Sequence, residues 1–164
     1  MSTTKHSFDK VANMLTQLGF TIVQEDAKRP WGGFYVIDET QAQQFAAHFF
    51  PEEDFEQLKI ADKLSPKILM VAPGKRLSWQ YHHRRAEIWK LIGGTANMVT
   101  SDTDEEKEIQ HLKTGDIVQL KQGRRHRLIG LDSWGIVAEI WQHTDVHYPS
   151  DEDDIVRVQD DFGR

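Results

Sequence analysis

The chain has 164 residues, the size of one domain with its own hydrophobic core. It contains no cysteine, which excludes disulfides, thiolate metal sites and cysteine nucleophiles. A net charge of −6 argues against a nucleic-acid partner, because binding to a phosphate backbone needs a basic face. The first residues carry charges, and no apolar run is long enough to cross a bilayer, so we expect a soluble cytoplasmic protein without a membrane partner.

The first part of the chain predicts helices and two short strands. Apolar residues recur at helical spacing over residues 7–18, and Gly19 supplies a stop signal. The runs "FTIVQED" and "GGFYVID" have the composition of strands, and proline and glycine in the intervening "AKRPWGG" prevent regular structure. A second helical segment follows in "ETQAQQFAAHFFPEEDFEQL", and we expect Pro51 to break it.

From Lys67 onward, the sequence predicts short strands with turn residues between them. The expected strands are "KILMVAP", "RLSWQYHH", "AEIWKLIGG", "TANMVTS", "EIQHLKTG", "DIVQLKQG", "HRLIGL" and "GIVAEIWQH". Such a series is typical of an antiparallel sandwich or barrel. We therefore expect a mainly β protein in which residues 67–143 form most of one barrel and the N-terminal helix packs outside it.

Three of these segments carry side chains that can bind a metal ion. Gln80 and His82 should point to one face of a strand, because alternate residues share a face. A turn then leads to the strand with Glu87, and His126 begins a later strand after the turn at Gly123. These residues offer only nitrogen and oxygen, a set that suits zinc, iron, manganese, cobalt or nickel. An ordinary surface or core position is the alternative for any single histidine, because the chain has eight.

The spacing of these residues resembles the cupin family. The first cupin motif, G-x5-H-x-H-x4-E-x6-G, is matched from Gly74 to Gly94, with Gln80 in place of the first histidine. The second, G-x5-P-x-G-x2-H-x3-N, is matched over residues 115–130 through His126, without its proline and asparagine. The resemblance implies an antiparallel double-stranded β-helix, or jelly-roll barrel, whose metal ligands are Gln80, His82, Glu87 and His126.

The Gln-x-His variant is similar to the metal site of phosphomannose isomerases, particularly the cupin domain at the end of bifunctional mannose-1-phosphate guanylyltransferase/mannose-6-phosphate isomerases. The blocks "RPWG", "LSWQYHHRRAEIW", "GTA", "EDDIVR" and "DFGR" resemble blocks of that domain. The resemblance covers residues 29–164, so we expect one cupin domain there, after an N-terminal helix and lead-in at residues 1–28. A helical insertion at about residues 40–64, together with Arg84 and Ile88, departs from the family pattern.

The resemblance implies a metal-dependent sugar-phosphate isomerase that interconverts mannose 6-phosphate and fructose 6-phosphate by proton transfer through an enediol. One divalent ion would hold the two sugar oxygens, with zinc the first choice and manganese, cobalt, nickel or iron as alternatives. Arg85 and Glu139 are the candidate catalytic residues. The candidate substrate-binding residues, chosen because guanidinium groups suit phosphate and aromatic rings suit sugars, are Arg85, Trp89, Arg127 and Arg157.

Two other functions stay open. A non-catalytic cupin would keep the barrel to bind a sugar phosphate or a sugar nucleotide. A metal-dependent dioxygenase is the weaker alternative, because iron oxygenases of the cupin type usually present a histidine where Gln80 stands. The expected partner is a small-molecule sugar phosphate, and a homodimer is a further expectation, because open sheet edges are often covered by pairing.

Overall fold

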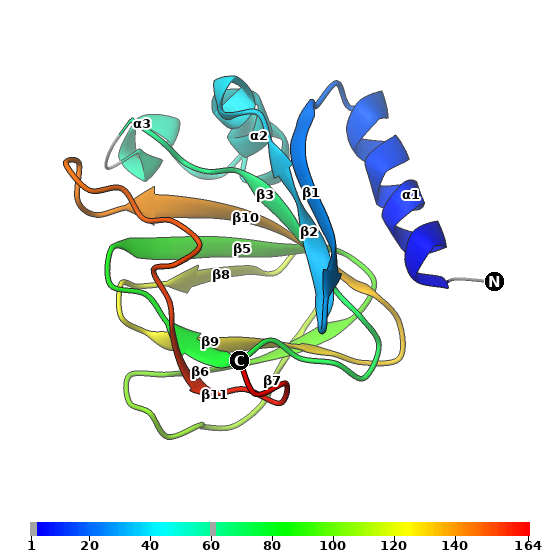
Figure 1. Ribbon diagram of the computed structural model, residues 1–164. Coiled ribbons are helices and arrows are strands. Elements are labelled where there is room, and N and C mark those ends of the chain that lie inside the picture. Colours follow the sequence, from blue (N-terminus) through cyan, green and yellow to red (C-terminus); the bar gives the residue numbers. More distant parts are fainter. Residues whose placement is uncertain (1–2, 60–61) are drawn as a thin grey trace.

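The protein is a sandwich of two antiparallel sheets with helices on one outer face (Figure 1). The structure is a computed structural model that describes residues 3–59 and 62–164. The six-stranded sheet contains, in spatial order, β1 (Ile22–Arg29), β2 (Gly32–Ile37), β3 (Lys67–Val71), β10 (Gly135–His143), β5 (Arg85–Gly93) and β8 (Ile117–Leu120). The five-stranded sheet contains β11 (Val156–Gln159), β4 (Trp79–Tyr81), β9 (Arg125–Gly130), β6 (Ala96–Ser101) and β7 (Gln110–Leu112).

This architecture confirms the expected cupin jelly roll. Residues 67–143 supply most of the strands, and β1, β2 and β11 extend the sheets beyond that range. The boundary expected after residue 28, between the lead-in and the cupin domain, stays a prediction. Residues 22–29 form one strand, β1, which crosses this position and pairs with β2 along its length. Among the described residues, no helix is both long and apolar enough to cross a membrane.

Side chains from the inner faces of the two sheets form a mixed core. Apolar residues such as Val71, Leu91, Leu128 and Val137 fill one part of it, because alternate residues of each strand point inward. Polar residues at other inward positions leave a cavity that includes Gln80, Glu87 and His126 in its lining. The barrel is therefore packed at one end and polar at the other.

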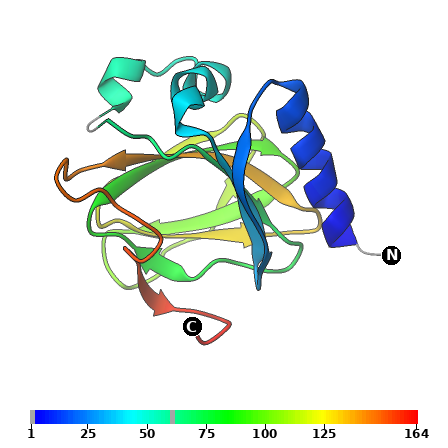
Figure 2. The ribbon, with the colours of Figure 1, turned by 45° about the horizontal axis from the view of Figure 1, so that its top comes forward.

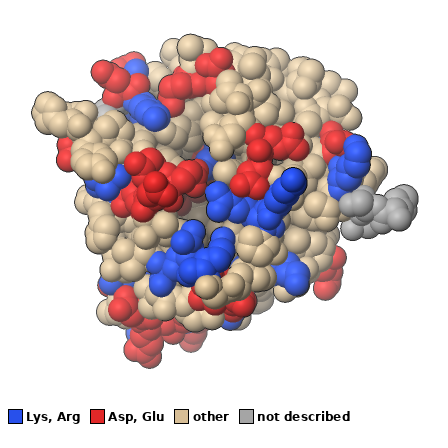
Figure 3. Space-filling view, viewed as in Figure 1, with Lys and Arg blue, Asp and Glu red and all other residues tan. Residues whose placement is uncertain are grey.

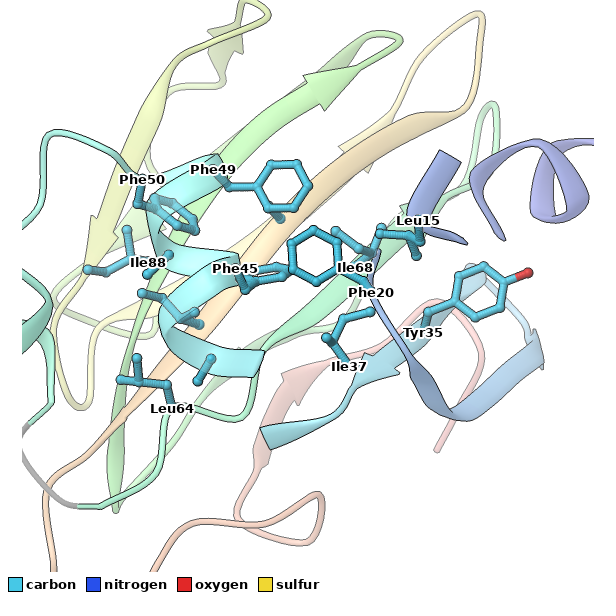
Figure 4. Close-up of a cluster of buried hydrophobic side chains, with 14 of the residues drawn as sticks. Leu15, Phe20, Tyr35, Ile37, Phe45, Phe49, Phe50, Leu64, Ile68 and Ile88 are labelled. Carbon is cyan, nitrogen blue, oxygen red and sulfur yellow. The ribbon is translucent and has the colours of Figure 1, made fainter. Parts of the chain in front are cut away.

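The helices bury a second apolar cluster against the outer face of the six-stranded sheet. The first helix, α1 (Thr3–Gln17), begins earlier than expected and ends at the predicted stop, where Gly19 has a positive φ of 86°. Its Phe8 and Leu15 are buried, and the Tyr35 hydroxyl on β2 donates a hydrogen bond to the Phe8 carbonyl at 2.9 Å. Figure 4 shows Leu15 and Tyr35 together with other buried side chains of this cluster.

The expected helical insertion forms the rest of this cover. It contains a 3₁₀ turn, η1 (Glu39–Gln41), followed by α2 (Ala42–Phe49) and α3 (Phe55–Leu58). The helices stop on either side of Pro51, as expected, and Asp54 caps α3 by accepting from the Glu56 amide. Residues 60 and 61 of the insertion lie outside the described residues. Figure 2 shows that the helices lie on the far side of the sandwich from β11.

Candidate metal centre

The candidate ligands come from both sheets and meet inside the sandwich. Glu87 lies on β5 of the six-stranded sheet, and His126 lies on β9 of the five-stranded sheet. His126 is the Cα partner of Gln80 on β4, and His82 follows directly after that strand. The jelly roll thus brings together residues that are far apart in the chain.

Three of the four predicted ligands converge. The ligating atoms of His82, Glu87 and His126 all lie within 4.8 Å of one another, and each side chain is 3% exposed. His82 Nε2 lies 3.3 Å from Glu87 Oε2, and His126 Nε2 lies 3.3 Å from Glu87 Oε1. Gln80 borders the same cavity, and its amide nitrogen donates to the Ser78 carbonyl at 3.2 Å, which leaves the amide oxygen as the atom that could coordinate an ion.

Backbone carbonyls orient both imidazole rings. His82 Nδ1 donates to the Asp154 carbonyl at 2.6 Å, and His126 Nδ1 donates to the Arg124 carbonyl at 3.0 Å. Because Nδ1 carries the proton in each ring, the Nε2 lone pair faces the other ligands, as metal-binding histidines require. Burial lowers the pKa of His82 to about 3, so its ring is neutral at neutral pH.

The carboxylate of Glu87 fits a metal ion better than it fits an ordinary core position. Burial alone would raise its pKa, but the charge of Arg85 and the nearby histidines hold the pKa of Glu87 well below its usual range. Its Oε1 is buried and has no hydrogen-bond partner. An ionised buried oxygen that lacks a donor is costly unless a cation completes the site. The donor set of nitrogen and oxygen therefore fits a divalent first-row ion.

Arg85 borders the cavity but is engaged by the protein itself. Its Nε donates to Glu87 Oε2 at 2.7 Å, and its Nη2 lies 3.2 Å from His82 Nε2. Its Nη1 donates to the Ser150 hydroxyl and to the Asp151 carbonyl, and the guanidinium stacks 3.6 Å from the Trp141 ring. The structure thus places Arg85 beside the candidate metal ligands Glu87 and His82.

Glu139 is held in the cavity by two indole groups. Its Oε2 accepts from Trp89 Nε1 at 2.7 Å, and its Oε1 accepts from Trp141 Nε1 at 2.9 Å. The strand register explains this arrangement, because Glu139 on β10 pairs with Trp89 on β5 and with Lys67 on β3. Burial and the nearby charge of Glu87 raise the pKa of Glu139 to about 8. Trp89 thus borders the cavity and donates to Glu139, and its binding of substrate stays a prediction.

A ring of basic groups surrounds the opening of the cavity. The basic residues that border the cavity there are Arg29, Lys67, Arg157 and Arg164, and the acidic Glu152 lies among them. Figure 3 shows basic and acidic side chains crowded around a hollow in the face that carries the C-terminal end. Arg29 is paired with Asp26 and Arg164 with Asp160, whereas Arg157 has no ion-pair partner among the described residues and its Nε is buried without an acceptor.

Among the predicted substrate-binding residues, Arg127 is the one that does not border the cavity. It is fully buried, and its guanidinium donates to the Leu77 carbonyl, to Glu106 and to Gln159. Because it is adjacent to His126 on β9, it points to the opposite face of the strand. This position does not support the predicted role of Arg127 in binding substrate.

Several residues that line the cavity were not predicted as site residues from the sequence. Arg29 and Arg164 lie in the "RPWG" and "DFGR" blocks, which offered a signal that they belong to the site. Ser78 shares the cavity-facing side of the chain with Gln80, and its hydroxyl is buried without a partner. Lys67 had no local signal, because its position depends on the register between β3 and β10.

The fold and the site together define a cupin barrel with a buried cluster of histidines and a carboxylate. The chain belongs to the mannose-6-phosphate isomerase C-terminal family, whose profile matches residues 38–160.

Full-length relatives are much longer than this chain. The xanthan biosynthesis protein XanB of Xanthomonas campestris is 31% identical over 136 residues, which are 83% of this chain and 23% of XanB. The mannose-1-phosphate guanylyltransferase of Escherichia coli is 30% identical over 142 residues, which are 87% of this chain and 24% of that protein. The chain thus spans about a quarter of the length of these curated relatives.

The fold is also similar to that of solved cupin proteins. Oxalate decarboxylase of Bacillus subtilis superposes with a TM-score of 0.55 at 14% identity, over 82% of this chain and 30% of the decarboxylase. At this level of identity the likeness concerns the fold alone.

Proposed function

We propose that the protein is a metal-dependent isomerase that converts a 6-phosphorylated aldose into the ketose, with mannose 6-phosphate as the expected substrate. One observation carries the proposal. Among the described residues, the buried side-chain atoms without a hydrogen-bond partner include Ser78 Oγ, Glu87 Oε1 and Arg157 Nε, and all three residues border the same cavity. A ligand with hydroxyl groups, a metal-binding end and an anionic end would satisfy all three.

The deep end of the cavity suits the reacting carbons. A divalent ion held by His82, Glu87, His126 and Gln80, with zinc the first choice, would act there as a Lewis acid on the sugar oxygens at C1 and C2. Arg85 keeps Glu87 in position through the hydrogen bond from its Nε. Burial excludes water from this end, which strengthens every charge interaction in it.

Glu139 is the proposed carrier of the proton between carbons. The isomerisation removes a proton from C2, returns one to C1 and moves a compensating proton from the oxygen on C2 to the oxygen on C1. A carboxyl whose pKa is about 8 is a stronger base, once ionised, than an ordinary glutamate, and near neutral pH it can also hold the proton it has taken. The indole N–H groups of Trp89 and Trp141 fix both of its oxygens.

The rim of the cavity suits the phosphate. Burial lowers the pKa of Arg157, and the positive charges of Arg164 and Arg29 lower it further, so three guanidinium groups lie near one another. Like charges gathered around an opening favour an anionic group there. We therefore propose that the phosphate binds to Arg157, Arg164 and Arg29, and that Arg85 acts near the reacting carbons.

The proposal is tested by exchange of the C2 proton with solvent. Wild-type protein loaded with zinc, manganese or cobalt should exchange the C2 proton of mannose 6-phosphate for deuterium, as measured by proton NMR, and a chelator should stop the exchange. Glu139→Gln should lower the exchange rate by at least about 100-fold while leaving the metal content unchanged. Metal-loaded protein that binds hexose and heptose phosphates but exchanges none of them would instead identify a non-catalytic binding cupin.

A further inference from the structure

Lys67 is a buried ammonium group at the border of the cavity. Its side chain is 5% exposed. Its Nζ lies 4.5 Å from the ring centre of Phe34 and 4.4 Å from that of Trp141. Aromatic faces stabilise a cation but do not replace the hydrogen-bond acceptors that an ammonium group loses on burial. Lys67 therefore needs an anionic or polar partner.

Within the described residues, that ion-pair partner is Glu152, whose Oε1 accepts a hydrogen bond from Lys67 Nζ. The Glu152 side chain is 50% exposed and also borders the cavity. A half-exposed carboxylate regains water when it rotates outward, whereas a buried ammonium cannot. The carboxylate is consequently the member of the pair that can leave, provided that another anion takes its place.

The other groups at the opening favour such an anion. The Arg29 guanidinium lies 5.4 Å from the centre of the same Phe34 ring that Lys67 contacts. Arg157, close enough to Arg29 for their charges to interact, has an unpartnered buried Nε. A phosphate has three terminal oxygens and up to two negative charges, so it can engage all three cations at once.

We propose that Lys67 binds the phosphate of the ligand. In the absence of ligand, Glu152 forms an ion pair with the Lys67 ammonium group, and the phosphate displaces Glu152 when it binds. The ligand class rests on the proposed function, whereas the exchange of partners rests on the contacts of Lys67. Because the phosphate must displace Glu152, its apparent affinity is reduced in proportion to the fraction of molecules in which the pair is closed. Removal of the Glu152 charge therefore tightens binding.

Binding of sorbitol 6-phosphate, measured by calorimetry, tests this exchange, because that compound has no carbonyl and cannot be isomerised. Glu152→Gln should bind it about fivefold more tightly, the size expected for loss of a partly exposed ion pair. Lys67→Met, which has a similar length and no charge, should bind it at least about tenfold more weakly. Asp153→Asn is the matched control, because it removes the same charge from the same segment, and its affinity should change by less than about twofold.

Equal tightening in Glu152→Gln and Asp153→Asn would overturn the proposal, because it would reflect net charge alone. Unchanged binding in Lys67→Met, or wild-type protein that does not prefer sorbitol 6-phosphate to sorbitol, would overturn it too. If Lys67→Met does not fold, as judged by circular dichroism, the comparison of Glu152→Gln with Asp153→Asn decides. Loss of the isomerase assignment in the exchange assay would leave this binding result unaffected, since sorbitol 6-phosphate does not react.

Discussion

The two indole groups that bind Glu139 have opposite consequences for its chemistry. They hold the carboxylate in one orientation, which a proton carrier needs. They also stabilise the ionised form, and the hydrogen bond from Trp89 lowers a pKa that burial has raised. The basicity of Glu139 therefore depends on a residue that sequence reasoning assigned to the binding of sugar.

Trp89→Phe should shift the pH dependence of C2 exchange to higher pH. The substitution keeps the aromatic packing but removes the N–H that donates to Glu139 Oε2, so the pKa of Glu139 rises above about 8. A hydrogen bond of this kind is worth about 1 kcal/mol, so the ionised fraction and the exchange rate at pH 7 should fall about fivefold. Rates measured by NMR from pH 6 to 9 give the profile.

Trp134→Phe is the control for this prediction. Trp134 packs against Phe8 beneath the N-terminal helix, away from the cavity. Its profile should match that of the wild type. A Trp89→Phe profile that falls uniformly at every pH would instead indicate that Trp89 orients Glu139 without tuning its pKa.

At the scale of strands and turns, the two glycines that frame the first cupin motif have different physical roles. Gly74 has a φ of 70°, and a Cβ placed there would meet no atom within 4 Å. Gly94 has a nearly equal φ of 68°, but its Cβ would lie 1.7 Å from the Trp134 carbonyl oxygen. The turn at Gly74 thus requires only a left-handed backbone, whereas the turn at Gly94 also requires a close approach of two chain segments.

Gly94→Ala should therefore destabilise the protein more than Gly74→Ala. The left-handed conformation alone costs about 1–2 kcal/mol for alanine, which is the expected loss at Gly74. At Gly94 the collision with backbone should raise the loss to about 3 kcal/mol or more. Urea unfolding followed by circular dichroism measures both values, and equal losses would contradict the role given to the close approach.

The motif residues were predictable because their positions depend on local geometry. Alternation along a strand and one turn bring His82 and Glu87 toward a common point, and the second motif adds His126. The same alternation, applied to β9, would have excluded Arg127 from the cavity at once. Ile88, which departs from the family pattern, packs in the cluster beneath the helices instead of in the cavity. Its side chain therefore packs against the helical cover and does not border the cavity.

The rest of the site could not be read from the sequence, because it depends on pairing between distant segments. Lys67 and Glu152 are 85 residues apart in the chain. Lys67 reaches the cavity because β3 pairs with β10 in a particular register, and a shift of one residue would turn its side chain to the outer face. No periodicity in "PKILMV" distinguishes this lysine from one at the surface.

For the whole molecule, metal binding should be a large part of the stability. An ion that binds only the folded protein stabilises it by about 2.7 kcal/mol when its concentration is 100 times its dissociation constant. For a chain of this size that corresponds to a rise of roughly 5–10 °C in Tm. Addition of a chelator to metal-loaded protein should lower Tm by this amount in a thermal melt followed by circular dichroism.

The variant His126→Ala supplies the control for the chelator experiment. It retains His82 and Glu87 but loses one of the three converging ligands. Its metal content should fall, and a chelator should change its Tm by little. A chelator effect as large as that of the wild type would place the stabilising ion elsewhere in the protein.

Residues 150–154 contact side chains of both the candidate metal centre and the proposed phosphate site. The Asp154 carbonyl accepts from His82, the Ser150 hydroxyl and the Asp151 carbonyl accept from Arg85, and Glu152 pairs with Lys67. One short segment thus contacts both the candidate metal centre and the proposed phosphate site, so we expect the two binding equilibria to be linked. Linkage is reciprocal: the factor by which zinc changes the affinity for a sugar phosphate must equal the factor by which that sugar phosphate changes the affinity for zinc.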